Sequence, residues 1–159
     1  MSDTSVKVVT VNFPAQEDSQ IFSFQWGEEI KTGYHLTETV KNYLYEPNSA
    51  LLKSGAFKLV SHRFSIEKLH IHSHLYTSNQ KINPFPGRIF QVKQVVEFSR
   101  KKLRQLGKQY PQANISVRNF PMSVAEIRKN SGIADGGDLY LLATTIGNAR
   151  RILIECKKA

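Results

Sequence analysis

Apolar and polar residues alternate in several stretches of the chain, which is the period typical of half-buried β-strands. The clearest of these stretches are residues 6–13, 21–26, 88–98 and 115–118. The first two are separated by the acidic loop of residues 14–19, so the pattern predicts an N-terminal β-hairpin there. An isolated two-stranded hairpin is marginally stable in water, so we expect it to pack on a helix or a further sheet.

Three other segments carry apolar residues at helical spacing, each after a residue suited to cap a helix. Asn48 precedes a segment that we expect to stay helical to about residue 64, with Gly55 in its interior. Ser99 precedes a helix predicted over residues 100–110. Ser123 and Glu126 form a Ser-x-x-Glu capping box, which predicts a short helix over residues 123–130 that ends before a left-handed Gly132.

Two apolar stretches close the chain and predict a pair of adjacent strands. Residues 139–146 are apolar on both alternating faces, so this strand should be covered on both sides. In the last strand we expect Ile152, Ile154 and Cys156 to face the core and Glu155 to face solvent. The second half therefore has the order βαβαββ, which predicts a two-layer sandwich of one sheet and two helices in an α+β fold.

Two prolines and a glycine in residues 84–87 mark a boundary between the halves of the chain. We predict one unit over residues 1–84, made of the hairpin and a helical connecting segment, and a second over residues 85–159. No apolar run approaches the roughly 20 residues that cross a bilayer, so a cytoplasmic protein without a membrane partner is expected.

Positive charge is concentrated in the second half. Residues 1–84 hold 8 Lys and Arg against 8 acids, whereas residues 85–159 hold 14 against 5, so the second half carries the whole net charge of +9. Because Lys and Arg neutralise phosphates and release counterions, this asymmetry indicates a nucleic-acid surface. The residues predicted to bind nucleic acid are Arg100, Lys101, Lys102, Arg104, Arg118, Arg128, Lys129, Arg150 and Arg151.

His70, His72 and His74 alternate in a segment that could be a strand, and imidazoles on one strand face have ligand-like geometry. No Cys lies nearby and no fourth ligand is evident, so exposed or hydrogen-bonded histidines are the favoured interpretation over a metal site. The single Cys156 is expected to be a buried apolar residue. No Ser/His/Asp or Cys/His arrangement is visible, so we predict no catalytic residue in this chain.

Several motifs together resemble a known family. They are Tyr-Leu-Tyr-Glu-Pro-Asn (43–48), Lys-Ser-Gly-Ala-Phe (53–57), Leu-His (69–70) with His-Leu-Tyr-Thr-Ser (74–78), Phe-Pro-Gly-Arg-Ile-Phe (85–90), residues 117–128 and Asp-Gly-Gly-Asp (135–138). From residue 43 onward the chain resembles the C-terminal region of class I S-adenosylmethionine-dependent methyltransferases of Bacteroidetes. In that family a Rossmann-like catalytic domain precedes a small ferredoxin-like domain and a THUMP-like domain, and the hairpin resembles the end of the ferredoxin-like domain.

The resemblance implies a role in RNA modification, because THUMP domains are associated with tRNA-modifying enzymes. S-adenosylmethionine is implied for the parent enzyme, but the chain has no Gly-x-Gly, so no cofactor-binding residue is predicted within it. We expect an accessory region that binds RNA, and tRNA in particular, beside the methyltransferase catalytic domain. The alternative is a docking module without nucleic-acid contact, whose surface Tyr43, Tyr45 and Phe57 would form.

Overall fold

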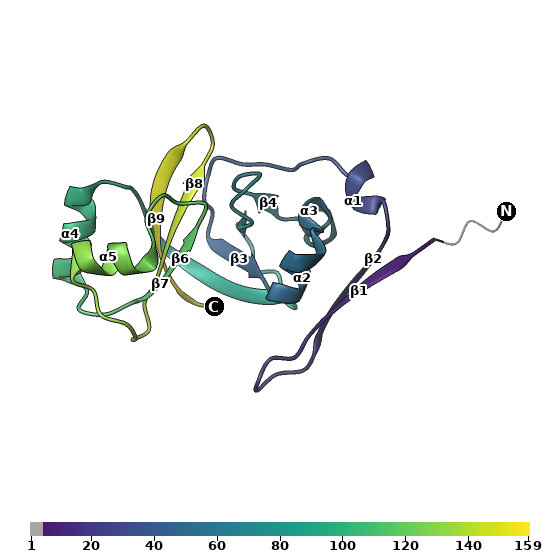
Figure 1. Ribbon diagram of the computed structural model, residues 1–159, viewed down its shortest axis with the longest axis horizontal. Coiled ribbons are helices and arrows are strands. Elements are labelled where there is room, and N and C mark those ends of the chain that lie inside the picture. The colour runs from purple at the N-terminus through teal and green to yellow at the C-terminus, as the bar shows by residue number, and fades with distance from the viewer. Residues whose placement is uncertain (1–4) are drawn as a thin grey trace.

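The structure is a computed structural model that describes residues 5–159 as an elongated α+β protein (Figure 1). It contains a two-stranded sheet at the N-terminus and a seven-stranded sheet with the order β4-β5-β3-β6-β9-β8-β7. All neighbouring strands are antiparallel except β7 and β8, which are parallel. The predicted fold class is confirmed, including the βαβαββ order of the second half.

The first half contains the predicted hairpin followed by short helices and strands. Its elements are β1 (Lys7–Asn12), β2 (Gln20–Gln25), α1 (Glu28–Lys31), β3 (Tyr43–Pro47), α2 (Ser49–Ser54), α3 (Phe57–Phe64), β4 (Glu67–Lys68) and β5 (Tyr76–Ser78). Asn48 caps α2 as predicted, since its side chain accepts a hydrogen bond from the backbone N–H of Leu51. The single helix expected up to residue 64 is wrong, because Gly55 adopts a left-handed conformation (φ 74°) and ends α2.

The second half contains β6 (Gly87–Glu97), α4 (Arg100–Gln109), β7 (Asn114–Arg118), α5 (Val124–Ser131), β8 (Tyr140–Ile146) and β9 (Arg150–Lys158). Both predicted caps are present. Ser99 accepts a hydrogen bond from the N–H of Lys102, and Ser123 and Glu126 form the complete capping box. Gly132 ends α5 in the left-handed conformation, as expected.

The long strand β6 joins the two halves into one sheet. Its residues 87–91 pair with β3 and its residues 90–97 pair with β9, so the two pairings overlap within one continuous strand. The register shifts between Val92 and Gln94, which marks a β-bulge in the middle of β6. Because one strand serves both halves, the basic half cannot turn freely against the first half.

Three buried clusters hold the molecule together. Between the hairpin, α2, α3 and β3 lies a cluster that includes Phe22, Phe24 and Tyr45. Helices α4 and α5 cover one face of the sheet, and residues of the β4–β5 turn help to cover the opposite face. Strand β8 is therefore covered on both sides, as predicted. No helix of the described chain is long and apolar enough to cross a membrane.

One prediction for the last strand is wrong. Glu155 is 2% exposed rather than solvent-facing, because α4 extends over this part of β9 and the hydroxyl of Tyr110 donates a hydrogen bond to the carboxylate at 2.8 Å. This bond is the main reason why the pKa of Tyr110 lies above its ordinary value. Cys156 is buried as expected, and its burial raises the pKa of the thiol to about 12.

Candidate nucleic-acid interface

Helix α4 presents a row of positive side chains to solvent. Leu103 and Leu106 are buried against the sheet, which fixes the rotation of the helix. Lys101, Arg104 and Lys108 follow a spacing of three and four residues, so they lie on the side of the helix opposite these leucines. We define the basic face as the exposed cations of α4, which are Arg100, Lys101, Lys102, Arg104 and Lys108.

No residue of the basic face forms an ion pair within the described part of the chain. The acids of the second half are mostly engaged elsewhere. Glu97 pairs with Arg150, Asp135 pairs with Arg128, Glu126 belongs to the capping box of α5, and Glu155 is bonded to Tyr110. The charge of α4 is therefore available to an external anion, and a helix of ten residues extends this row over about 15 Å.

Two further predicted residues lie near the ends of α4. The N–H of Phe98 donates to the carbonyl oxygen of Arg151 at 2.8 Å, which places Arg151 beside the start of the helix. Lys129 is exposed on α5, which packs closely on α4 where Gly107 approaches the backbone of Ser131. The fold thus brings six of the nine predicted residues to the region of α4: Arg100, Lys101, Lys102, Arg104, Lys129 and Arg151.

The other three predicted residues are engaged with carboxylates. Arg128 bonds Asp135 at 2.7 Å and also donates to the carbonyl oxygens of Ile133 and Ala113, so it ties the end of α5 to the strand before it. Arg150 donates to Glu97 across β6 and β9, with an Nε–Oε1 distance of 3.1 Å. Arg118, at the end of β7, pairs with Glu46 of β3, a strand that β6, β9 and β8 separate from β7 in the sheet order.

Glu46 lies at the edge of a cleft of about 520 Å³ between the two halves. Arg88 donates two hydrogen bonds to one oxygen of this carboxylate, and Arg118 approaches the other oxygen at 2.5 Å. Lys81 and Lys158 also line the cleft. Arg118 is therefore a contact between the halves of the protein, which sequence reasoning did not identify because its partner is 72 residues away.

The histidine segment is not a strand, so its imidazoles do not share one strand face. Residues 69–74 form a turn between β4 and β5. His70 accepts a hydrogen bond from the N–H of His72, whereas His74 stacks on Phe57 with ring centroids 3.7 Å apart. Burial is the largest cause that lowers the pKa of His74, to about 4, and a nearby positive Lys68 adds to it. The described residues contain no group of His, Cys, Asp and Glu that could hold a metal.

The aromatic residues suggested as a docking surface belong mainly to the core. Tyr45 is fully buried, and its hydroxyl accepts a hydrogen bond from the N–H of Ile82. Tyr43 is partly buried against the same cluster, and Phe57 is partly covered by His74. Nearly all exposed large apolar residues of the described chain lie instead on the N-terminal hairpin and the segment after it. Alternation in the sequence predicted the hairpin but could not say which of its two faces stays uncovered.

Two family models match adjacent parts of this fold. Residues 43–86 match a ferredoxin-like domain, and residues 87–158 match a THUMP domain-like family. The order of a ferredoxin-like domain followed by a THUMP-like domain agrees with the sequence motifs, but the ferredoxin-like match begins after the hairpin rather than including it. The hairpin precedes the residues matched by either model.

A solved structure is similar over nearly the whole chain. It is that of a "putative methyltransferase from Porphyromonas gingivalis W83", a member of the Bacteroidetes, which is 42% identical to this chain. The match covers 97% of this chain with a TM-score of 0.91, whereas this chain spans 38% of the length of that protein. No curated protein matches the chain.

Proposed function

We propose that the chain is an RNA-binding accessory region of an S-adenosylmethionine-dependent RNA methyltransferase, and that its RNA is a tRNA. The observation that carries this proposal is the basic face of α4, whose five cations have no carboxylate partner in the described structure. The THUMP-like domain and the similarity to a methyltransferase support the same role.

The proposed contacts are to phosphates. Lys and Arg side chains on an exposed helix face can follow a ribose-phosphate backbone without reading bases. Double-stranded RNA is recognised mainly by its shape and its backbone, which suits a convex row of cations better than a pocket would. We assign the direct contacts to the basic face, with Lys129 and Arg151 near its ends. Three ion-paired residues contribute less to RNA binding, because an RNA phosphate would have to displace the carboxylate that each of them contacts. They are Arg118, Arg128 and Arg150.

The methyl donor belongs to the parent enzyme in this proposal. S-adenosylmethionine would supply the methyl group, and the residues of this chain do not fit its binding. The connections that lead from a strand into α4 and α5 contain no pair of glycines that would let the cofactor approach the backbone. The role of the chain is to hold the RNA in the cytoplasm beside a catalytic domain that binds the donor.

The proposal is tested by binding of fluorescently labelled tRNA at several salt concentrations. We expect the triple variant Lys101→Ala, Arg104→Ala, Lys108→Ala to bind tRNA at least about tenfold more weakly near 0.1 M salt. If these side chains contact three phosphates, the slope of log K against log salt should fall by about 2 to 3. Circular dichroism should show an unchanged fold, because all three side chains are exposed.

A matched control removes the same charge at a distance from α4. Lys7, Lys31 and Lys53 are exposed and lie on β1, α1 and α2. Their triple alanine variant should keep nearly all of the affinity and the salt slope. Equal losses of tRNA affinity in the two variants would show that binding depends only on the net charge of the chain and not on α4. Full affinity in the α4 variant would refute the proposed interface.

A further inference from the structure

We propose that the outer face of the N-terminal hairpin, together with the segment that follows it, is a docking surface for the methyltransferase domain of the parent enzyme. This inference rests on the methyltransferase part of the proposed function, and it does not depend on RNA binding. The docking surface is defined as the exposed apolar residues between positions 6 and 36.

Exposed apolar residues are concentrated in this one region. Ten large apolar side chains of the described chain are exposed, and nine of them lie between residues 6 and 36. The tenth, Val95, lies on β6 and is 38% exposed. The nine are Val6, Val9, Val11, Phe13, Ile21, Trp26, Ile30, Tyr34 and Leu36. Val9, Val11 and Ile21 share the outer face of the hairpin, and the other exposed apolar residues lie beside it in the sequence. Such a concentration of exposed apolar residues indicates a surface that another protein covers.

The two faces of the hairpin differ in how exposed their apolar side chains are. Val11 pairs with Ile21 across the strands, and their exposed fractions are 40% and 62%. On the opposite face Phe22 and Phe24 are 5% and 6% exposed and belong to the core. The inner face therefore anchors the hairpin to the domain, while the outer face has no cover among residues 5–159. The described sheet of β1 and β2 contains no third strand, but on the outer edge of β2 the N–H of Gln25 and the carbonyl oxygen of Ser23 are already bonded to Glu28 and Arg63. A partner would therefore contact the apolar side chains of the outer face rather than extend the sheet.

The docking surface is held firmly in place. Thr10 donates a hydrogen bond to the carbonyl oxygen of Phe22 inside the hairpin. Behind it, the carboxylate of Glu29 in α1 accepts hydrogen bonds from the N–H groups of Lys58 and Leu59 at 2.8 and 2.9 Å, so it satisfies the first turn of α3. The apolar side chains are thus presented by a fixed scaffold, which lowers the entropy cost of binding a partner.

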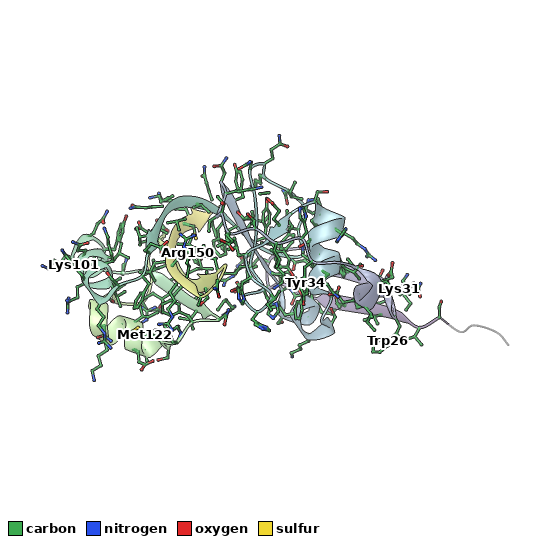
Figure 2. The ribbon with its side chains drawn as sticks, turned by 90° about the horizontal axis from the view of Figure 1, so that it is seen from above. Trp26, Lys31, Tyr34, Lys101, Met122 and Arg150 are labelled. Atoms are coloured by element: carbon green, nitrogen blue, oxygen red, sulfur yellow. The ribbon has the colours of Figure 1, made fainter. Side chains whose placement is uncertain are left out.

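Charge and position favour a protein partner over nucleic acid. Residues 5–36 contain four acids and two lysines, so this surface would repel phosphates. It also lies at the end of the molecule opposite α4, as the positions of Trp26 and Lys101 show (Figure 2). One partner can therefore occupy the docking surface while RNA lies on the basic face.

The methyltransferase domain is the occupant to which the observations point. The similar P. gingivalis protein contains this region as 38% of its length, so most of that polypeptide is available to pack against it. Residues 6–36 precede both matched domain families, hence neither family accounts for this apolar surface. A hairpin whose inner face joins the ferredoxin-like core and whose outer face is apolar is suited to couple that core to a neighbouring domain.

Photocrosslinking in the complete P. gingivalis protein tests the inference. The photoreactive residue benzoylphenylalanine is placed at the position aligned with Ile21, and in a matched control at the position aligned with Val95. We expect the first protein to give crosslinks within one polypeptide to peptides outside the region aligned with this chain, at least about tenfold more than the control. Crosslinks to a second copy, or only within the aligned region, would overturn the inference.

A second measurement covers the case in which no crosslink forms. The double variant Val11→Lys, Ile21→Glu should leave urea unfolding of the 159-residue chain nearly unchanged, because both residues are exposed in it and the two new side chains carry opposite charges across the hairpin. The same change at the aligned positions of the complete protein should raise the rate of proteolysis between its domains several-fold. An unchanged rate would overturn the inference. Binding of tRNA by the 159-residue variant should be unaffected, so failure of docking and failure of the RNA proposal give different results.

Discussion

Glu46 offers a test of how the two halves are joined. Its side chain is 5% exposed, whereas those of its partners Arg88 and Arg118 are 42% and 39% exposed. Arg88 lies on the neighbouring strand β6 and donates to one carboxylate oxygen from Nε at 2.7 Å and from Nη2. Arg118, at the end of β7, faces the other oxygen. One buried anion is therefore shared between two partly hydrated cations.

The losses of stability expected from substitutions follow from the difference in exposure between the buried carboxylate and the partly exposed arginines. Replacing either arginine by Met leaves the carboxylate with one cation, and the lost pair is partly exposed, so each change should cost about 1 kcal/mol. Replacing both leaves a buried carboxylate without a counterion, which costs about 3–5 kcal/mol. We therefore predict that Arg88→Met and Arg118→Met are coupled by about 1–3 kcal/mol.

Urea unfolding followed by circular dichroism measures this coupling in a double-mutant cycle. Adding Glu46→Leu to the double arginine variant removes the buried charge, so it should recover most of the lost stability. The reasoning is refuted if the double arginine variant loses no more than the sum of the two single variants, or if Glu46→Leu destabilises it further.

Two other predictions concern stability. A Cβ on Gly107 would lie 2.8 Å from the carbonyl carbon of Ser131 and closer still to its oxygen. Gly107→Ala should therefore push α4 away from α5 and lower the free energy of unfolding, measured by urea titration, by about 1–3 kcal/mol. Gln105→Ala, on the exposed side of α4, should change this free energy little. Burial lowers the pKa of Lys68 to about 7 from 10.5, although nearby Glu29 opposes this shift. Between these pH values the unfolded chain binds more protons than the folded chain, so the free energy of unfolding should rise with pH from about 7 toward 10. Urea titrations of Lys68→Met over this pH range should show a smaller rise.

Local signals in the sequence predicted most of the elements. The caps at Asn48, Ser99 and Ser123 act within a few residues, so their side-chain chemistry is visible in the sequence itself. Strand alternation and the βαβαββ order were sufficient for the α+β fold of the second half. The helix-interior position predicted for Gly55 is wrong, because the sequence does not distinguish a glycine within a helix from a glycine that ends one, whose φ angle is positive.

The sequence predicted the part of the candidate site that lies on one helix, but not the contacts between distant strands. The basic face of α4 follows from helical periodicity, since its cations alternate with buried leucines. The ion pair of Arg118 with Glu46 depends on how a curled sheet brings distant strands together, which no local pattern contains. The same holds for Glu155, whose burial depends on the position of Tyr110 above β9.

The overlap of two strand pairings on β6 makes the family boundary at residues 86 and 87 a poor place to divide the protein. A protein that ended at residue 86 would expose the hydrogen-bonding edge of β3. A protein that began at residue 87 would leave the first residues of β6 without β3, the strand with which they pair. We expect both pieces to aggregate. The ferredoxin-like and THUMP-like domains should therefore act as a single stiff arm that sets a constant distance between its two ends.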